Sequence, residues 1–295
     1  MNEIPETWLR ILLAGPVGSG KSHQALSMPL PVVVLYSDRM GGDADLLGLE
    51  SAGVHVWRID RFDPRGSMLK MIGKLQNGGL KAMGIKSVVW DTPTYTINHA
   101  KSQETNHNRN GMQLHQNKKV AFDILDVCDA LFELEANILI LSHIKEEVVK
   151  DKKTKEVVSR VWVPDMMGST VKAISRECAL MGYTWKKVDG DGKPNRYGIC
   201  FAQNMRDKNG RVVMEFRDVK APNGWGSNEP ANVRLLIERL KQEAATRRQA
   251  ALEALHVDVD LSKDLPEETP TEGALEGEPK DPAEGSNEPS PMEQG

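Results

Sequence analysis

The sequence predicts an α/β fold with a mostly parallel central sheet, and three observations support this class. Five apolar runs of four to seven residues, rich in Val, Ile and Leu, recur in the first half of the chain. Helical patterns lie between several of these runs, which is typical of strand–helix–strand units. The chain has 295 residues, of which 39% are hydrophobic, so it is long enough to bury a sheet on both faces. Runs without a polar face are typical of such doubly covered strands.

Expected strands and helices alternate as far as residue 143. Strands are expected at residues 8–14, 31–36, 54–59, 87–90 and 138–141. Helices are expected at residues 22–28, 67–75 and 118–134. The third helical segment has the clearest pattern, because its apolar residues share one face: Ala121, Ile124, Leu125, Cys128, Leu131 and Phe132.

The pattern changes after residue 143 to hairpins and a final helix. Hairpins are expected at residues 145–164 and 182–202, each around a polar turn. Apolar residues at three- and four-residue steps then predict a helix over residues 230–255 that closes the folded domain. Pro230 suits the first turn of that helix, where a missing N–H costs nothing.

Residues 1–255 are expected to form one folded domain, and residues 256–295 a disordered acidic tail. The tail is rich in Pro, Glu and Gly and has no aromatic residue, so it cannot bury enough apolar surface to offset the entropy of ordering. It carries twelve acidic residues and two lysines, a net charge of −10. Because the whole chain has a net charge of −4, the folded domain carries +6. A basic domain favours an acidic partner such as nucleic acid.

Cysteine usage and the N-terminus indicate the cytoplasm. The cysteines Cys128, Cys178 and Cys200 show no paired spacing, so neither a disulfide framework nor a zinc knuckle is indicated. The N-terminus is acidic where a secretory signal would be basic, and no apolar run approaches the roughly 20 residues that cross a bilayer. We therefore expect no membrane partner.

Residues 15–22 read GPVGSGKS and match the phosphate-binding pattern GxxxxGK[ST]. We call them the phosphate loop. The loop follows the first expected strand and opens a helix, which is the arrangement that this chemistry requires, whereas a plain glycine-rich turn needs no such context. Lys21 would reach the β- and γ-phosphates of ATP, and Ser22 would bind Mg²⁺. The residues expected to contact the nucleotide are Gly15, Gly18, Ser19, Gly20, Lys21 and Ser22.

Three polar residues at the ends of other strands are candidates for catalysis. Asp91 ends an apolar strand and is the expected Mg²⁺ carboxylate, although such an acid often only begins a turn. Asp38 would orient or activate the attacking water, but a turn acid is an equal interpretation. His143 follows the fifth strand, at the sheet edge where ligands of parallel sheets bind, and would sense the γ-phosphate. Its alternative role is purely structural.

The order of these motifs resembles that of the short RecA-like P-loop ATPases. More narrowly, it is similar to phage-encoded nucleotide-binding proteins related to single-strand annealing recombinases. The resemblance covers residues 8–240 and rests on the phosphate loop, residues 37–42, residues 87–92, and residues 138–143 followed by a charged hairpin. It implies a single RecA-like domain that binds ATP and Mg²⁺, engages single-stranded DNA and promotes annealing or recombination, often as a homo-oligomer.

Carried over to this sequence, the resemblance makes Asp91 the Walker B residue and His143 the γ-phosphate sensor. One position departs from the pattern: with Gly41 and Gly42 as the anchor, the catalytic glutamate of the family falls on Met40. Asp38 is then the nearby acid. The resemblance therefore implies slow ATP hydrolysis.

Two segments are candidates for contact with single-stranded DNA. The first, residues 92–116, is expected to be a long polar loop. The second is the hairpin at 145–164, where basic side chains for phosphates and an aromatic ring for stacking suit sequence-tolerant binding. Its candidates are Lys150, Lys152, Lys153, Lys155, Arg160 and Trp162. The alternative is a solvated hairpin whose lysines only protect a sheet edge from aggregation.

Two other function classes remain open from the sequence. A small-molecule or nucleotide kinase also uses a phosphate loop, but it needs an arginine-rich lid where this chain offers lysines. A nucleotide-gated binding module with little hydrolysis is compatible with Met40. The acidic tail would dock a recombination or replication partner or compete with DNA. Arg206 and Lys208 would act on the γ-phosphate of a neighbouring subunit, or are ordinary surface charges.

Overall fold

The computed structural model describes residues 8–37, 53–105, 113–151, 153–191, 194–206 and 209–257. The chain divides into two compact units, residues 1–243 and residues 244–295. The first unit contains the sheet and the phosphate loop, and the second begins within the last helix. The expected domain boundary between residues 255 and 256 stays a prediction. Within the described residues, no helix is long and apolar enough to cross a membrane.

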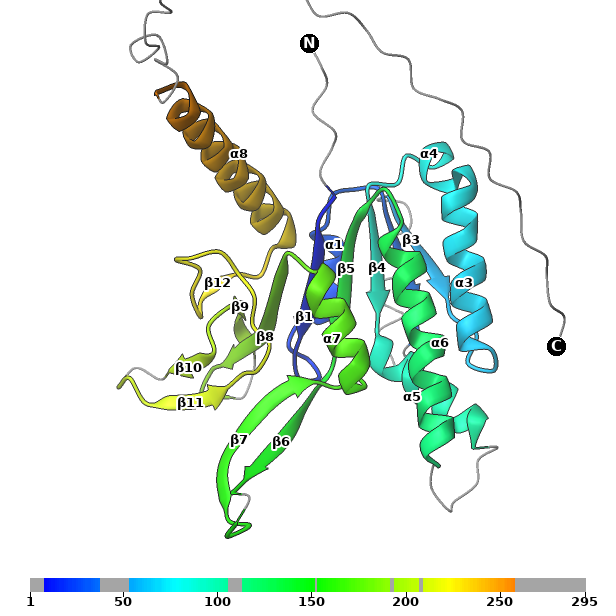
Figure 1. Cartoon of the computed structure of the whole chain (residues 1–295), viewed down its shortest axis with the longest axis horizontal. Coiled ribbons are helices and arrows are strands. Elements are labelled where there is room, and N and C mark those ends of the chain that lie inside the picture. The colour runs from blue at the N-terminus through cyan, green and yellow to red at the C-terminus, as the bar shows by residue number, and fades with distance from the viewer. Residues whose placement is uncertain are drawn as a thin grey trace, which may run out of the picture. The chain divides into compact units, whose positions relative to one another are not determined.

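An eight-stranded sheet forms the centre of the first unit (Figure 1). Its order is β12 (Glu229–Pro230), β9 (Pro194–Cys200), β8 (Leu180–Val188), β1 (Arg10–Ala14), β5 (Asn137–Ser142), β4 (Ser87–Asp91), β2 (Val32–Tyr36) and β3 (Val54–Arg58). The strands from β8 to β3 run parallel, and β9 and β12 are antiparallel to their neighbours. The predicted fold class, α/β with a mostly parallel sheet, is confirmed.

Helices cover both faces of the sheet, because successive residues of each strand point to opposite sides. In β1, Leu12 packs with the helices of one face, and Ile11 and Leu13 pack with those of the other. The first face carries α3 (Pro64–Lys74), α5 (Pro93–Glu104), α6 (Leu114–Phe132) and α7 (Gly168–Glu177). The second face carries α1 (Lys21–Leu26) and the start of α8 (Val233–Val257). After α3 the chain continues through η2 (Leu75–Gly79) and α4 (Leu80–Ala82).

The five expected strands and three expected helices are present, with ends shifted by a few residues. The segment 92–116 is wrong as a loop, because Pro93–Glu104 forms α5 and α6 already begins at Leu114. Thr92 caps α5, since its side chain accepts a hydrogen bond from the N–H of Thr94 at 3.1 Å. Pro93 follows at the first helical position, where it is favoured.

In the C-terminal part of the domain, one expectation is confirmed and one is corrected. The hairpin expected at 182–202 is present as β8 and β9, and it belongs to the main sheet because β8 also pairs in parallel with β1. Pro230 belongs to β12 rather than to the last helix, which begins at Val233 after Asn232. The side chain of Asn232 accepts from the N–H of Leu235 at 3.2 Å and so caps that helix.

A second hairpin stands apart from the sheet. It consists of β6 (Ile144–Lys150) and β7 (Val157–Pro164), and we call it the ribbon. Figure 1 shows it projecting beyond the central sheet. Near its base lies a smaller hairpin of β10 (Asn204–Arg206) and β11 (Val212–Glu215). The base is held by Tyr183, whose ring stacks on Phe216 with centroids 4.1 Å apart and whose hydroxyl donates to the carbonyls of Arg217 and Trp162.

Candidate functional site

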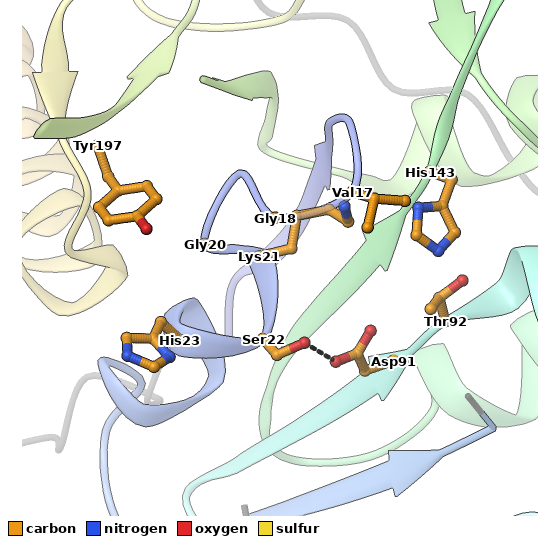
Figure 2. A pocket seen from close by; sticks show the side chains of 10 residues that line it. All are labelled: Val17, Gly18, Gly20, Lys21, Ser22, His23, Asp91, Thr92, His143 and Tyr197. Carbon is orange, nitrogen blue, oxygen red and sulfur yellow. Dashed lines mark hydrogen bonds between the residues drawn. The ribbon is translucent and has the colours of Figure 1, made fainter. Parts of the chain in front are cut away.

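The phosphate loop and the expected Asp91 meet at the carboxyl edge of the sheet. In the sheet order, β5 lies between β1, which leads into the loop, and β4, which ends in Asp91. The N–H of Gly15 donates to the carbonyl of Ser142 at 3.0 Å and so ties the loop to the end of β5. A pocket of about 250 Å³ opens at this edge (Figure 2). It is lined by Val17, Gly18, Gly20, Lys21, Ser22, His23, Asp91, Thr92, His143 and Tyr197.

The shape of the loop depends on two of its glycines. A Cβ atom at Gly15 would lie 2.0 Å from the hydroxyl oxygen of Thr184, so any side chain there would push the loop away from β8. That hydroxyl forms a hydrogen bond of 2.6 Å with Ser19. Gly20 has a φ of 81° and precedes α1, a backbone conformation that other residues rarely adopt. The loop is therefore fixed from two sides, by its own glycines and by β8.

Lys21 is only 6% exposed, and its side chain turns back into the loop. Its ammonium group donates to the carbonyls of Gly15 at 2.9 Å and Pro16 at 2.7 Å. A buried ammonium needs such acceptors, because burying a charge without partners is costly. The loop thus holds a positive charge against two of its own carbonyls, and a phosphate bound in the loop would meet that charge.

Ser22 and Asp91, the two expected magnesium residues, are in direct contact. The Ser22 hydroxyl donates to Oδ2 of Asp91 at 2.7 Å, although the two residues are 69 positions apart (Figure 2). Asp91 is 2% exposed at the end of β4. A hydroxyl and a single carboxylate fit Mg²⁺, which is usually held by one or two protein oxygens together with water and phosphate. Among the described residues, no group of three or more His, Cys, Asp and Glu side chains gathers as a structural metal site would require.

His143 lines the same pocket from the end of β5 and is edge-on to Tyr95, with ring centroids 5.3 Å apart. The backbone N–H of His143 donates to the hydroxyl of Thr94 at 3.2 Å, and that hydroxyl donates to the backbone carbonyl of Asp165 at 3.0 Å. His143 immediately precedes the ribbon and Asp165 immediately follows it. The 5% exposed Thr94 therefore joins the start of α5 to both roots of the ribbon, and sequence reasoning did not identify it.

The end of β2 is tied to the same edge. The Ser37 hydroxyl donates to the carbonyl of Thr92 at 2.6 Å and accepts from its N–H at 3.1 Å. Asp38 and Met40 lie outside the described residues, so the position of the expected water-activating acid stays a prediction.

Tyr197 and His23 also line the pocket, and neither was expected from the sequence. Tyr197 comes from β9, far along the chain, and no motif marks it. Just after β8, the N–H of Asp191 donates to the Asp189 carboxylate at 3.0 Å. Only the pairing of β8 with β1 brings the β8–β9 hairpin to the loop.

The candidate DNA residues lie on the ribbon and not in the pocket. Lys150, Lys153 and Lys155 surround its exposed tip, and Lys152 lies outside the described residues. Within the tip, backbone N–H groups of Thr154 and Lys153 donate to the carboxylate of Asp151 and lower its pKa. That carboxylate therefore stays ionised and offsets part of the lysine charge.

Two of the candidate DNA residues on the ribbon contact other side chains of the same chain. Arg160 forms an exposed ion pair with Glu146 at 3.4 Å. Trp162 is half-buried and packs against the aromatic cluster of Tyr183 and Phe216 at the ribbon's base, so its ring serves packing there. Arg206 donates to the carbonyl of Gly210 within its own hairpin at 2.7 Å, and Lys208 lies outside the described residues.

The three cysteines take no part in the pocket. All are free and buried, and burial raises the pKa of the Cys178 thiol to about 12 and also raises that of Cys128. A thiol that remains protonated is a poor nucleophile and metal ligand.

Comparison with known proteins gives the family. The model of the AAA domain family matches residues 7–218. One similar solved structure is an ATPase from the type III secretion system of pathogenic bacteria, with 12% identity and a TM-score of 0.38. The similarity covers 62% of this chain and 51% of that one, so this chain spans about half the length of that ATPase. No curated protein matches the sequence. Because the family model covers more than half of the chain, including the phosphate loop, Asp91 and His143, the chain belongs to the AAA domain family and carries a P-loop ATPase domain.

Proposed function

We propose that the protein binds ATP with Mg²⁺ in this pocket, hydrolyses it slowly, and uses the bound nucleotide to control binding of single-stranded DNA during annealing or recombination. The observation that carries the nucleotide part is the 2.7 Å contact between Ser22 and Asp91. It joins a residue of the phosphate loop to a carboxylate on another strand, where one Mg²⁺ would be held by both.

Each pocket residue has a role in this proposal. Lys21 neutralises the charge of the β- and γ-phosphates, which is the main contribution that a protein makes to phosphoryl transfer. The backbone N–H groups of the phosphate loop orient the same phosphates. Ser22 and Asp91 hold Mg²⁺, which would polarise the phosphoryl oxygens when bound. His143, which lines the pocket after β5, would donate to the γ-phosphate.

Slow hydrolysis is supported by the small number of carboxylates in the pocket. Among the described residues that line it, Asp91 is the only carboxylate, and it already accepts from Ser22. A water molecule that attacks the γ-phosphate needs a separate group to orient it or accept its proton. Asp38, the candidate from the sequence, would have to supply that group.

The DNA part rests on the charge and position of the ribbon. The ribbon begins at Ile144, directly after His143, so a movement of His143 toward a γ-phosphate is transmitted to β6 without an intervening loop. Its exposed lysines at the tip would contact phosphates of a single strand, and each contact would contribute through counterion release. The excess of +6 on residues 1–255 favours the same partner.

The proposal includes three points that rest on the sequence resemblance. The protein is a relative of phage-encoded annealing proteins, acts in the cytoplasm of the host cell, and assembles as a homo-oligomer on DNA. The tail at 256–295 docks a basic recombination or replication partner or competes with DNA.

One experiment tests the proposal: ATP hydrolysis by the full chain, with and without single-stranded DNA, beside the Lys21→Ala variant. We expect slow turnover that DNA stimulates and that Lys21→Ala abolishes, with a loss on the order of 100-fold or more. Lys118→Ala, an exposed lysine on α6, is the matched control and should behave as the parent chain. Turnover that Lys21→Ala leaves intact would contradict the site.

A second function is favoured by the single carboxylate of the pocket: a nucleotide-gated binding module that hardly hydrolyses ATP. Nucleotide-dependent DNA binding without turnover would support this module. Phosphate transfer to a small acceptor would instead indicate a kinase.

A further inference from the structure

The β8–β9 hairpin lies directly over the phosphate loop. Its register places Lys186 opposite Tyr197 and Thr184 opposite Ile199. Opposite residues of an antiparallel pair share a face, as do alternate residues of one strand. Thr184, Lys186 and Tyr197 therefore belong to one face, and each of them contacts the loop at a different residue.

These contacts fall on three consecutive residues of the loop. The Thr184 hydroxyl bonds to that of Ser19 at 2.6 Å. A Cβ atom at Gly18 would lie 3.2 Å from the ammonium nitrogen of Lys186, and one at Gly20 would lie 3.0 Å from the ring of Tyr197. From Gly18 through Ser19 to Gly20, the hairpin thus presents an ammonium group, a hydroxyl and an aromatic ring in that order.

The opposite face of the hairpin is built differently. Trp185 lies across from Gly198, where a Cβ atom would be 2.3 Å from its ring, and its indole N–H donates to the carbonyl of Ser227 at 3.1 Å. Arg196 lies over the Trp185 ring, with its guanidinium carbon 5.9 Å from the centroid. Lys187 lies opposite Arg196 in the strand register, so it belongs to this face and not to the face that contacts the loop.

The pocket has a polar end and an aromatic end. In Figure 2, Asp91, Thr92 and His143 lie on one side of the phosphate loop, and Tyr197 and His23 lie on the other. Tyr197 remains 40% exposed although its ring touches the loop, so part of the ring faces solvent. An exposed ring beside a phosphate site is suited to stacking a flat group that is attached to the phosphates.

We propose that the β8–β9 hairpin is a second nucleotide-binding element, in which Tyr197 stacks on the base and Lys186 pairs with the phosphates. This proposal rests on the proposed nucleotide binding and adds the orientation of the ligand. The triphosphate points toward Asp91 and His143, and the base lies toward Tyr197 and His23. Lys186 acts from the outside of the loop, whereas Lys21 acts from within it.

The proposal is tested by comparing two ligands that differ only in the nucleoside. Binding of Mg-ATP and of inorganic tripolyphosphate with Mg²⁺ is measured calorimetrically on the full chain. Tyr197→Ala should weaken ATP binding about 10-fold, because a stacked base is lost, and should leave tripolyphosphate binding unchanged. Tyr197→Phe keeps the ring and should bind ATP as the parent chain does. Lys186→Ala should weaken both ligands several-fold.

Lys187→Ala is the matched control, because it removes the same charge from the other face of the same strand and should change neither ligand. Unchanged ATP binding in Tyr197→Ala, or an equal loss for both ligands, would overturn the base-stacking role. Equal effects of Lys186→Ala and Lys187→Ala would overturn the phosphate role. Failure of the proposed function gives a different result, because neither ligand would then respond to Lys21→Ala.

Discussion

The pocket and the ribbon meet at His143, which lines the pocket and directly precedes the ribbon, but they differ in how far their polar side chains are exposed to solvent. In the pocket, Lys21 and Asp91 are 6% and 2% exposed, and each has a partner at hydrogen-bond distance. On the ribbon, Lys150, Lys153 and Lys155 are exposed around a tip beside exposed valines. Electrostatic interactions are strong where water is excluded and weak where it is not. A single substitution in the pocket should therefore have a large effect on ATP turnover, whereas several substitutions on the ribbon should be needed for a comparable effect on DNA affinity.

The largest effect is expected from Asp91→Asn. The amide keeps the size of the side chain and an oxygen that accepts from Ser22, so the fold should be retained. Loss of the charge should lower Mg²⁺ affinity and ATP turnover by about 10- to 100-fold. A Mg²⁺ titration of turnover measures this, with thermal melting as the control for folding. An unchanged Mg²⁺ dependence would show that Asp91 belongs to the packing of the sheet edge and not to the metal.

The next effect is expected from removing three charges at the ribbon tip. Substitution of Lys150, Lys153 and Lys155 by Gln should weaken single-stranded DNA binding about tenfold and lower the salt slope by about 2, since each phosphate contact on a single strand adds about 0.7. ATP binding should not change. The control is a triple substitution of Lys70, Lys74 and Lys81, which are exposed on α3 and α4. If both triple variants lose DNA binding equally, net charge and not the ribbon is responsible.

A smaller effect connects the two regions through Thr94. Thr94→Val keeps the shape of the side chain but removes the hydroxyl that contacts His143 and Asp165. We expect ATP to stop changing the affinity for single-stranded DNA, while ATP binding itself stays within a few-fold. Leaving these partly buried backbone groups without the hydroxyl should also cost about 1 kcal/mol of stability. Thr94→Ser restores the hydroxyl and should restore the response to ATP, which a purely structural role would not predict.

The smallest effect is expected from removal of residues 256–295. Their net charge of −10 should oppose DNA at the basic domain, so the shortened chain should bind single-stranded DNA a few-fold more tightly at low salt. The difference should disappear at high salt, where charges are screened. Equal affinity at low salt would leave the tail as a partner tether or a solubilising segment. Titration of labelled DNA at two salt concentrations measures the difference.

The sequence predicts what is local and misses what depends on distant pairing. The phosphate loop is recognisable because eight consecutive residues carry its chemistry, and Asp91 because an apolar strand leads into it. Tyr197 could not be predicted, since only the parallel pairing of β8 with β1 brings it to the loop. Helix α5 was missed because Thr94, Thr96 and His99 occupy positions on its buried face, and polar residues there hide the apolar period.

The pairing at one edge of the sheet limits how copies of this chain can associate. Strand β12 has only two residues, Glu229 and Pro230, and Pro230 has no N–H to donate to a further strand. Short edge strands that contain proline are a common protection against edge-to-edge aggregation. A sheet that continues from one subunit to the next is therefore blocked at β12. A filament of this protein could not form by adding a strand to β12.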